Sequence, residues 1–210
     1  DEATAIEAEV FGKADALAVV SRELVEYVMG KGAKAARVQV IGNAVDTHLF
    51  HPGTAAETVA SIPSGQFTVG FTGSLKAWHG TDILVAAFAQ LARRLPAHLL
   101  IIGDGPERPL LQDHIRSLGL EQRVTITGWV PHHRLPSRLG QSADLLGPTE
   151  AGLLVAPGDS LALAAALERV ATDGQLAQTL SARAAALGRQ HDWQANARRV
   201  IHLVREGVMA

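Results

Sequence analysis

A short turn near the middle of the chain combines a glycine with residues that can bind an anion. Gly73 ends the apolar stretch 67–72, Lys76 follows it, and apolar residues recur at helical spacing from Ile83 onward. Gly73 lets a ligand approach the backbone, the amide groups at the start of a helix attract negative charge, and Lys76 adds a positive charge. The turn therefore suits a phosphate or diphosphate. An ordinary strand-to-helix loop with a solvated lysine explains the same residues equally well.

Two further glycine turns end later apolar stretches. Gly103 and Gly105 follow the stretch 98–102, and Gly128 follows the stretch 123–127. Consecutive parallel strands usually lie side by side, and ligands of open α/β sheets bind at the carboxyl ends of the strands. We therefore expect the three glycine turns to lie together and to form one binding cleft. Three unrelated packing turns are the alternative.

These turns need a parallel sheet to hold them together. Apolar strands that alternate with helices are typical of a parallel sheet covered on both faces, which predicts an α/β fold with a doubly wound sheet. A stretch rich in proline, glycine and serine, 43–65, indicates a linker before the regular part of this pattern. The expected strands are 16–20, 38–42, 67–72, 98–102, 123–127 and 143–146, and the expected helices are 22–29, 80–94, 107–118, 133–140, 161–171, 176–187 and 193–208.

The composition excludes several classes of function. A net charge of -2 over 210 residues gives no electrostatic footprint for nucleic acid. The absence of cysteine rules out a disulfide framework and a thiolate metal site, and it is compatible with a reducing cytosol. No apolar run reaches the length of a membrane span. We therefore expect a cytoplasmic protein, and a peripheral membrane association stays open.

Because the chain begins with aspartate, we expect it to be part of a longer protein.

A nicotinamide-binding site is a weaker interpretation of the second turn. Asp104 stands at the end of a strand, where dinucleotide-binding folds place the acid that holds a ribose. Arg108, however, stands where the third glycine of G-x-G-x-x-G would be. His132 and His133 are adjacent and lack helical ligand spacing, so a surface pair is favoured over a metal site.

Three tryptophans offer large aromatic surfaces. Trp78 and Trp129 lie in the expected turns and could stack on a ligand. Trp193 stands at the start of the last expected helix. We expect it to be a packing anchor for that helix.

The order of the motifs resembles the family 4, or group 1, glycosyltransferases, which have the two-domain GT-B fold. The resemblance implies a Rossmann-like C-terminal domain that binds a nucleoside diphosphate sugar, a remnant of the N-terminal acceptor domain, and C-terminal helices. No single motif is diagnostic, but seven in the right order are quite specific. The matching stretches are "ADALAVVS" at 14–21, "VIGNAVDTHLFHP" at 40–52, "GSLKAWHGTDILVAAF" at 73–88, "LLIIGDGPERPLL" at 99–111, "RVTITGWVP" at 123–131, "GLLVAPGDSLALAAAL" at 152–167 and "HDW" at 191–193.

The resemblance also implies roles for individual residues. The turn at Gly73 would meet the diphosphate, and the backbone near Trp129 and Val130 would meet the base. The family often has an arginine after that glycine and a lysine before the next one, where this chain has Ser74 and His79. Transfer would retain the anomeric configuration, with no cofactor and no metal site, to an acceptor that the sequence does not identify. The expected donor-binding residues are Gly73, Ser74, Lys76, His79, Gly103, Gly105, Trp129 and Val130.

The chain departs from the family pattern near Leu146. Only six residues separate Leu146 from Leu153, where the family has a loop, a helix with two glutamates that contact the donor, and a further strand. We expect residues 1–50 to be the acceptor-domain remnant and linker, 51–190 the sugar-nucleotide domain with an internal gap near 146–152, and 191–210 a C-terminal helix. The natural protein would contain the missing segments, and an intact mass near 22.2 kDa would count against that.

Three functions follow from this pattern. The first is the donor-binding half of a retaining hexosyltransferase, the second a nucleotide-binding module without chemistry, and the third an NAD-dependent oxidoreductase. We expect no sugar transfer by this polypeptide alone, because the glutamate-bearing segment is missing, and measured transfer would refute that expectation. Titration with nucleoside diphosphates and with NAD separates the first function from the third.

Overall fold

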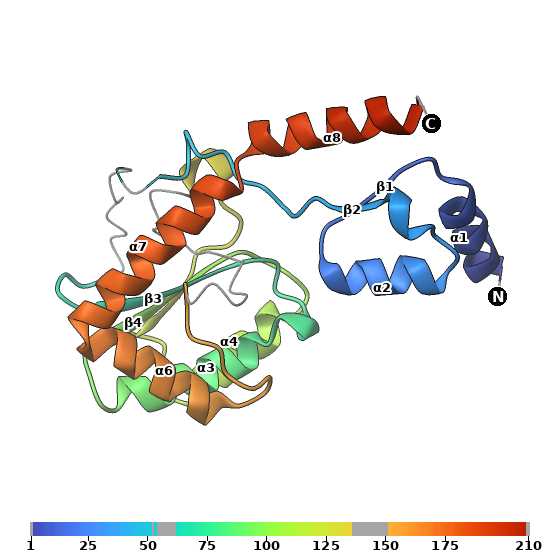
Figure 1. Ribbon diagram of the computed structural model, residues 1–210. Helices are drawn as coiled ribbons and strands as arrows, with labels where there is room; N and C mark the ends of the chain where they lie inside the picture. The colour runs from blue at the N-terminus through green and yellow to red at the C-terminus, as the bar shows by residue number, and fades with distance from the viewer. Residues whose placement is uncertain (1, 52, 54–61, 136–150, 209–210) are drawn as a thin grey trace. The chain divides into compact units, whose positions relative to one another are not determined.

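The computed structural model of the protein has two compact units (Figure 1). One unit combines Asp1–His48 with Gly188–Ala210, and the other is Leu49–Leu187. Among the described residues, no helix has both the length and the apolar character that crossing a bilayer requires. The described residues are 2–51, 53, 62–135 and 151–208.

The described residues of the larger unit form a parallel sheet of three strands. These are β3 (Phe67–Thr72), β4 (Ala97–Ile102) and β5 (Val124–Ile126), in the order β3-β4-β5. All six residues of β4 are buried, since this strand lies between the other two. The predicted parallel pairing is therefore confirmed, and the strand at 67–72 has the predicted bounds.

Helices cover one face of this sheet. The helices α3 (Thr81–Ala92), α4 (Arg108–Ser117) and α6 (Ser160–Thr172) gather on one side of β3 and β4 (Figure 1). Their apolar side chains form one core with alternate residues of the strands, and burial of that apolar surface stabilises the unit. The fully buried members of this core are Leu75, Val85, Phe88, Leu91, Leu99 and Ile101.

On the opposite face of the sheet, the residues of β4 are buried but those of β3 are exposed. On β4, His98 and Leu100 are buried, whereas Thr68 and Gly70 on β3 are exposed. The expectation of a sheet covered on both faces therefore holds for β4 but fails along β3. Within the described residues, β3 pairs only with β4, so it is the edge strand of this sheet.

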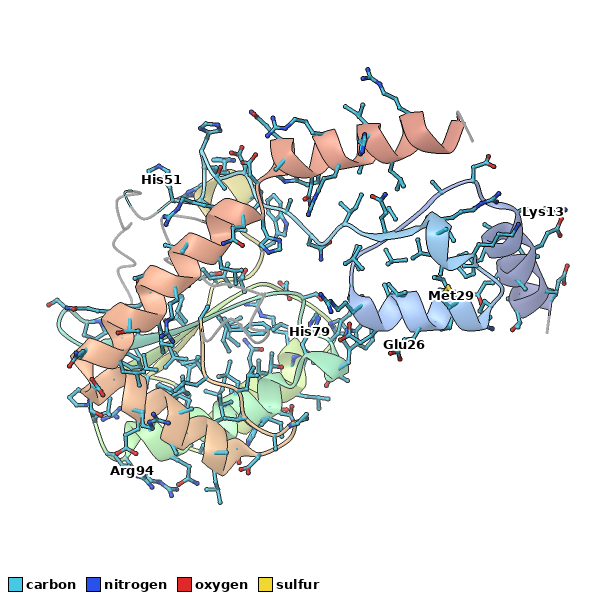
Figure 2. All side chains as sticks on the ribbon, in the orientation of Figure 1. Lys13, Glu26, Met29, His51, His79 and Arg94 are labelled. Carbon is cyan, nitrogen blue, oxygen red and sulfur yellow. The ribbon has the colours of Figure 1, made fainter. Side chains whose placement is uncertain are left out.

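The α3–α6 contact is reinforced by a charged pair at the surface. Arg94, which follows α3 (Figure 2), donates a hydrogen bond to the carboxylate of Glu168 on α6. The helix α7 (Gly174–Gln190) follows α6 and leads back to the smaller unit.

The described residues of the smaller unit form two parallel strands, three α-helices and a short 3-10 helix, η1 (Ala35–Arg37). The strands β1 (Leu17–Val19) and β2 (Val38–Val40) pair in parallel, and α2 (Arg22–Gly30) connects them. Ser21 caps α2, since its side chain accepts a hydrogen bond from the amide of Leu24. The remaining helices are α1 (Glu2–Lys13) and α8 (Trp193–Val208).

Two features of the helices differ from the sequence-based expectations. No helix was expected over α1; none of its residues is fully buried, and Phe11 packs partly buried against the small core of Val19, Val28 and Ala33. Trp193 was expected to be a packing anchor for α8, but 61% of its surface is exposed, and Asn196 and Leu203 are the buried residues of this helix.

The region after β5 is described only in part. A 3-10 turn, η3 (His132–Arg134), stands at the start of the helix expected at 133–140. The rest of that helix and the strand expected at 143–146 lie outside the described residues.

Candidate functional site

The three glycine turns meet at the carboxyl edge of the parallel sheet. The amide of Gly73 donates a hydrogen bond of 3.1 Å to the carbonyl oxygen of Ile102, at the end of the next strand. The amide of Gly103 donates one of 3.0 Å to the carbonyl oxygen of Gly128, with which it forms an isolated antiparallel bridge. The turns therefore lie side by side, in the order of their strands.

Two of these glycines have no room for a side chain. A β-carbon on Gly103 would lie 1.9 Å from the carbonyl oxygen of Gly73, and one on Gly105 would lie 2.3 Å from the carbonyl oxygen of Leu75. Gly103 also has a φ of +150°, which residues with a β-carbon rarely adopt. The close approach of the first two turns thus requires glycine at both positions.

Leu75 joins the first two turns through its backbone. Its amide donates to the carbonyl oxygen of Asp104 (2.9 Å), and its carbonyl oxygen accepts from the amide of Glu107 (3.1 Å). Its side chain is fully buried in the core beneath the sheet edge. Sequence reasoning overlooked this residue. The signal that could have revealed it is a single leucine between the polar residues Ser74 and Lys76.

The polar side chains of the first turn contact one another and the turn's own backbone. His79, which precedes α3 (Figure 2), places its Nδ1 within hydrogen-bonding distance of the Ser74 carbonyl oxygen and 3.4 Å from Ser74 Oγ. The ammonium group of Lys76 lies 4.8 Å from the centre of the Trp78 ring, a cation–π contact. Lys76 is exposed, and 75% of the Trp78 surface is exposed. The turn thus presents a fixed backbone and one accessible positive charge.

Asp104 and Arg108 form an ion pair beside the second and third turns. Arg108 Nη1 lies 2.7 Å from Asp104 Oδ2, and Asp104 Oδ1 accepts a hydrogen bond from the amide of Gly105. A β-carbon on Gly128 would lie 3.4 Å from Arg108 Nη1, so the pair borders the third turn. Both oxygens of Asp104 therefore have partners within the loop, which differs from the role of a free ribose-binding acid.

The pKa of Asp104 is predicted to depend on Arg108. The Gly105 amide, and then the Arg108 guanidinium, lower the pKa of this carboxyl below its ordinary value. The contribution of Asp104 to stability is therefore present above the pKa of an unfolded aspartate and is lost as the pH falls through the lowered value. Arg108→Gln should raise the pKa of Asp104 toward the ordinary value, measured from its ¹³C carboxyl shift against pH. Arg116→Gln, which removes another exposed ion pair of α4, should leave it unchanged. An unaltered titration in Arg108→Gln would contradict the prediction.

The third turn carries the two residues expected near a base. Gly128 is buried and has a φ of +75°, and Trp129 follows it directly with 78% of its surface exposed. Val130 is half-buried. Because the third turn is hydrogen-bonded to the second, Trp129 offers an aromatic surface at the same sheet edge.

The two adjacent histidines lie on the surface, as predicted. His132 and His133 are exposed, and the ring of His132 lies 5.1 Å from the ring of Phe50, measured between centroids. Among the residues that the structure describes, no group of three or more histidine, aspartate or glutamate side chains is placed to hold a metal ion.

The sequence is similar to known glycosyltransferases over the part that forms the three turns. Residues 66–146 match the family model described as "Glycosyl transferases group 1". The D-inositol 3-phosphate glycosyltransferase of Nocardia farcinica is 30% identical over 154 residues, which are 67% of this chain and 33% of the relative. The alpha-D-kanosaminyltransferase of Streptomyces kanamyceticus is 40% identical over 70 residues, 33% of this chain and 18% of the relative. The chain thus spans about a third or less of the length of these relatives.

Solved structures share the fold over nearly the whole chain. Sucrose-phosphate synthase from Thermosynechococcus elongatus matches with a TM-score of 0.80 at 24% identity, covering 98% of this chain and 62% of that one. Anabaena HepE in complex with UDP and glucose matches with a TM-score of 0.77 at 20% identity, covering 97% of this chain and 66% of that one. These similarities confirm the expected α/β Rossmann-like fold of the GT-B type.

Proposed function

We propose that the chain is the donor-binding part of a glycosyltransferase that uses a nucleoside diphosphate sugar, because residues 66–146 match the family model of the group 1 glycosyltransferases. The observation that carries the proposal is the set of three hydrogen-bonded glycine turns at the carboxyl edge of a parallel sheet. Ligands of open α/β sheets bind at this edge. Residues 51–190 would form the sugar-nucleotide domain, 1–50 the remnant of an acceptor domain with its linker, and 191–210 a C-terminal helix.

The diphosphate would lie against the first turn. Gly73 exposes backbone there, and α3 begins at Thr81 with its amide groups at the N-terminal end of the helix dipole. Lys76 would contribute a full positive charge, and Ser74 and His79 would hold the turn in shape through their mutual contacts. These groups would stabilise the negative charge that develops on the diphosphate as the bond to the sugar breaks.

The base would lie against the third turn. The exposed indole of Trp129 and the backbone of Val130 stand next to Gly128, and Gly103 and Gly105 connect this turn to the first. A nucleoside diphosphate could therefore extend from Gly73 across Gly103 to Trp129, along three neighbouring strands.

The same proposal implies a stereochemistry of transfer, a class of acceptor and no need for a further cofactor. Transfer would retain the anomeric configuration and move a hexose to a sugar, a lipid-linked sugar or a small molecule. The donor would be a substrate, with no further cofactor. We expect a cytoplasmic location, with which the absence of cysteine is compatible, and a peripheral membrane association stays open.

The first experiment measures donor binding by isothermal titration calorimetry. UDP and GDP should bind the chain, and Lys76→Ala should weaken the binding about five- to tenfold, the effect of losing one charge-assisted contact. Lys34→Ala removes an equally exposed lysine from the smaller unit and should change the affinity less than about twofold. NAD is the competing ligand. If NAD binds more tightly than either diphosphate, or if both lysine variants weaken binding equally, the proposal is wrong.

A further inference from the structure

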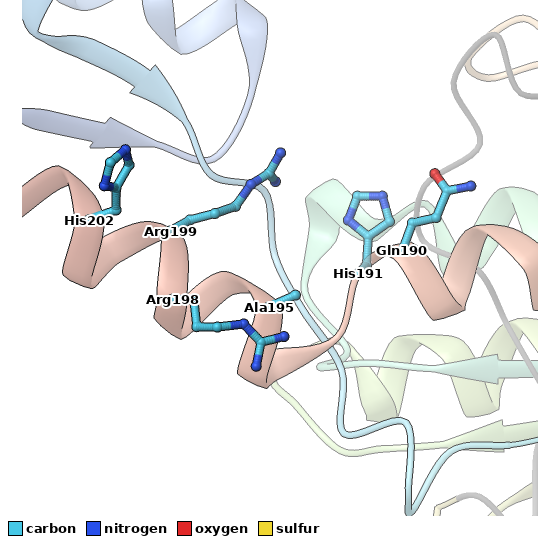
Figure 3. A pocket seen from close by; sticks show the side chains of 6 residues that line it. All are labelled: Gln190, His191, Ala195, Arg198, Arg199 and His202. Atoms are coloured by element: carbon cyan, nitrogen blue, oxygen red, sulfur yellow. The ribbon is translucent and has the colours of Figure 1, made fainter.

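A pocket in the smaller unit is lined mainly by cationic and hydrogen-bond-donating side chains. It has a volume of about 560 Å³ and lies where α7 ends and α8 begins (Figure 3). Every residue that lines it belongs to the unit formed by Asp1–His48 and Gly188–Ala210. The lining residues are Gln190, His191, Ala195, Arg198, Arg199 and His202.

The helical spacing brings the basic residues to one part of α8. Arg198 and Arg199 are adjacent on α8, and His202 follows them by about one helical turn. Figure 3 shows Arg199 and His202 extending to the same side as His191, which stands at the junction of the two helices, whereas Arg198 extends to the other side of α8. The pocket is thus lined by basic side chains of α8 and by His191 at the junction of the two helices.

The carboxylate nearest in sequence does not neutralise this charge. Asp192 Oδ2 accepts a hydrogen bond from Thr47 Oγ1 (2.6 Å), and its Oδ1 accepts from the amides of Gln194 and Ala195 at the start of α8. Asp192 does not line the pocket. Within the described part of the chain, Arg198 and Arg199 take part in no side-chain hydrogen bond or ion pair. Their guanidinium groups remain available to a ligand.

The backbone around the pocket is held in place by hydrogen bonds. The amide of Val45 donates to the carbonyl oxygen of His191 (2.8 Å), and the amide of Trp193 donates to the carbonyl oxygen of Val45 (3.1 Å). Asn196, which is buried, donates through Nδ2 to the carbonyl oxygen of Gly42. The start of α8 is therefore fixed to the segment 42–47, and a ligand would meet a preformed site.

We propose that this pocket binds a small molecule that carries a phosphate group. Two guanidinium groups can each form paired hydrogen bonds to phosphate oxygens, and the two imidazoles and the Gln190 amide add further donors. The volume lies within the range of small-molecule sites. The proposal is independent of the donor site, because the glycine turns belong to the other unit. Inorganic pyrophosphate and a phosphorylated sugar share the required chemistry.

Calorimetry on the whole chain tests the proposal with inorganic pyrophosphate and glucose 6-phosphate as separate probes at constant ionic strength. The double variant Arg198→Ala/Arg199→Ala should bind at least one probe about tenfold more weakly or worse, since two charge-assisted contacts are lost. Tighter binding of glucose 6-phosphate than of pyrophosphate would identify a phosphorylated sugar as the preferred ligand. The reverse order would identify the free anion. UDP binding through Lys76 should stay within about twofold of its original value, because the variant leaves the glycine turns intact.

A matched control and a second variant keep the result interpretable. Arg205→Ala removes the same charge from the same helix at a position outside the pocket and should leave binding of both probes unchanged. If the double alanine variant does not fold, Arg198→Lys/Arg199→Lys keeps the charges, loses the paired geometry, and should still weaken binding. The proposal is overturned if neither probe binds at millimolar concentration, or if Arg205→Ala weakens binding as much as the double variant does.

Discussion

Replacing Gly103 with alanine should lower the free energy of unfolding by about 3 kcal/mol or more. The new β-carbon would stand 1.9 Å from the carbonyl oxygen of Gly73, and both atoms belong to backbone that the sheet holds in place. The turns at Gly73 and Gly103 must separate, so binding of UDP should weaken together with stability. Urea denaturation followed by circular dichroism, together with calorimetric titration of UDP, measures both effects.

Gly119→Ala is the matched control for this variant. Gly119 also has a positive φ, +65°, but a β-carbon there would meet no atom within 4 Å. The control should therefore cost only the conformational penalty of about 1–2 kcal/mol, and UDP binding should not change. Equal losses in the two variants would show that the turns do not approach each other as closely as described.

Shortening Leu75 to alanine should cost about 2–5 kcal/mol of stability, the usual range for a fully buried leucine. Leu75 fills the core under the first turn, and its backbone bonds to Asp104 and Glu107 hold that turn against the second. The cavity would loosen the segment that carries Ser74 and Lys76. We therefore expect a lower affinity for UDP even at temperatures where the variant stays folded.

Leu110→Ala provides the comparison. Leu110 lies on α4 with 64% of its surface exposed, so the same truncation should change stability by less than about 0.5 kcal/mol. Thermal unfolding of the two variants under identical conditions gives the difference. A loss at Leu75 no larger than that at Leu110 would contradict the assignment of Leu75 to the core.

The parallel sheet of the larger unit could be predicted because its strands carry strong local signals. The apolar run 98–102 is buried along its length, and Gly73, Gly103 and Gly128 mark where the strands end. The same logic predicts that the three turns share one edge, as the hydrogen bonds between them confirm. These features depend on residues that are close together in the sequence.

Other features could not be predicted because they depend on contacts between distant segments. The helix α1 has a local signal in its Glu9–Lys13 pair, but its hydrogen bond from Tyr27 to Glu7 comes from a distant segment. The backbone bonds of Leu75 require the two turns to be brought together first. Trp193 was wrongly expected to pack, because an aromatic residue at a helix start gives no indication of which helix face meets the core.

The sugar-nucleotide site itself remains a prediction. The family resemblance implies that Ser74 and His79 bind the donor, and this stays a prediction; in the structure both side chains are exposed and lie 3.4 Å apart, measured from Ser74 Oγ to His79 Nδ1. Lys76 and Trp129 are accessible, and each stands on one of the two outer turns of the three.

The central claim is that three adjacent glycine turns form one binding surface for a nucleoside diphosphate. The most direct measurement is a titration of the ¹⁵N-labelled chain with UDP, followed through its backbone amide signals. The account predicts saturable shifts, with one common dissociation constant, at the amides of Gly73, Lys76, Gly105 and Trp129. Shifts confined to residues outside these turns, or an unchanged spectrum at saturating UDP, would contradict it.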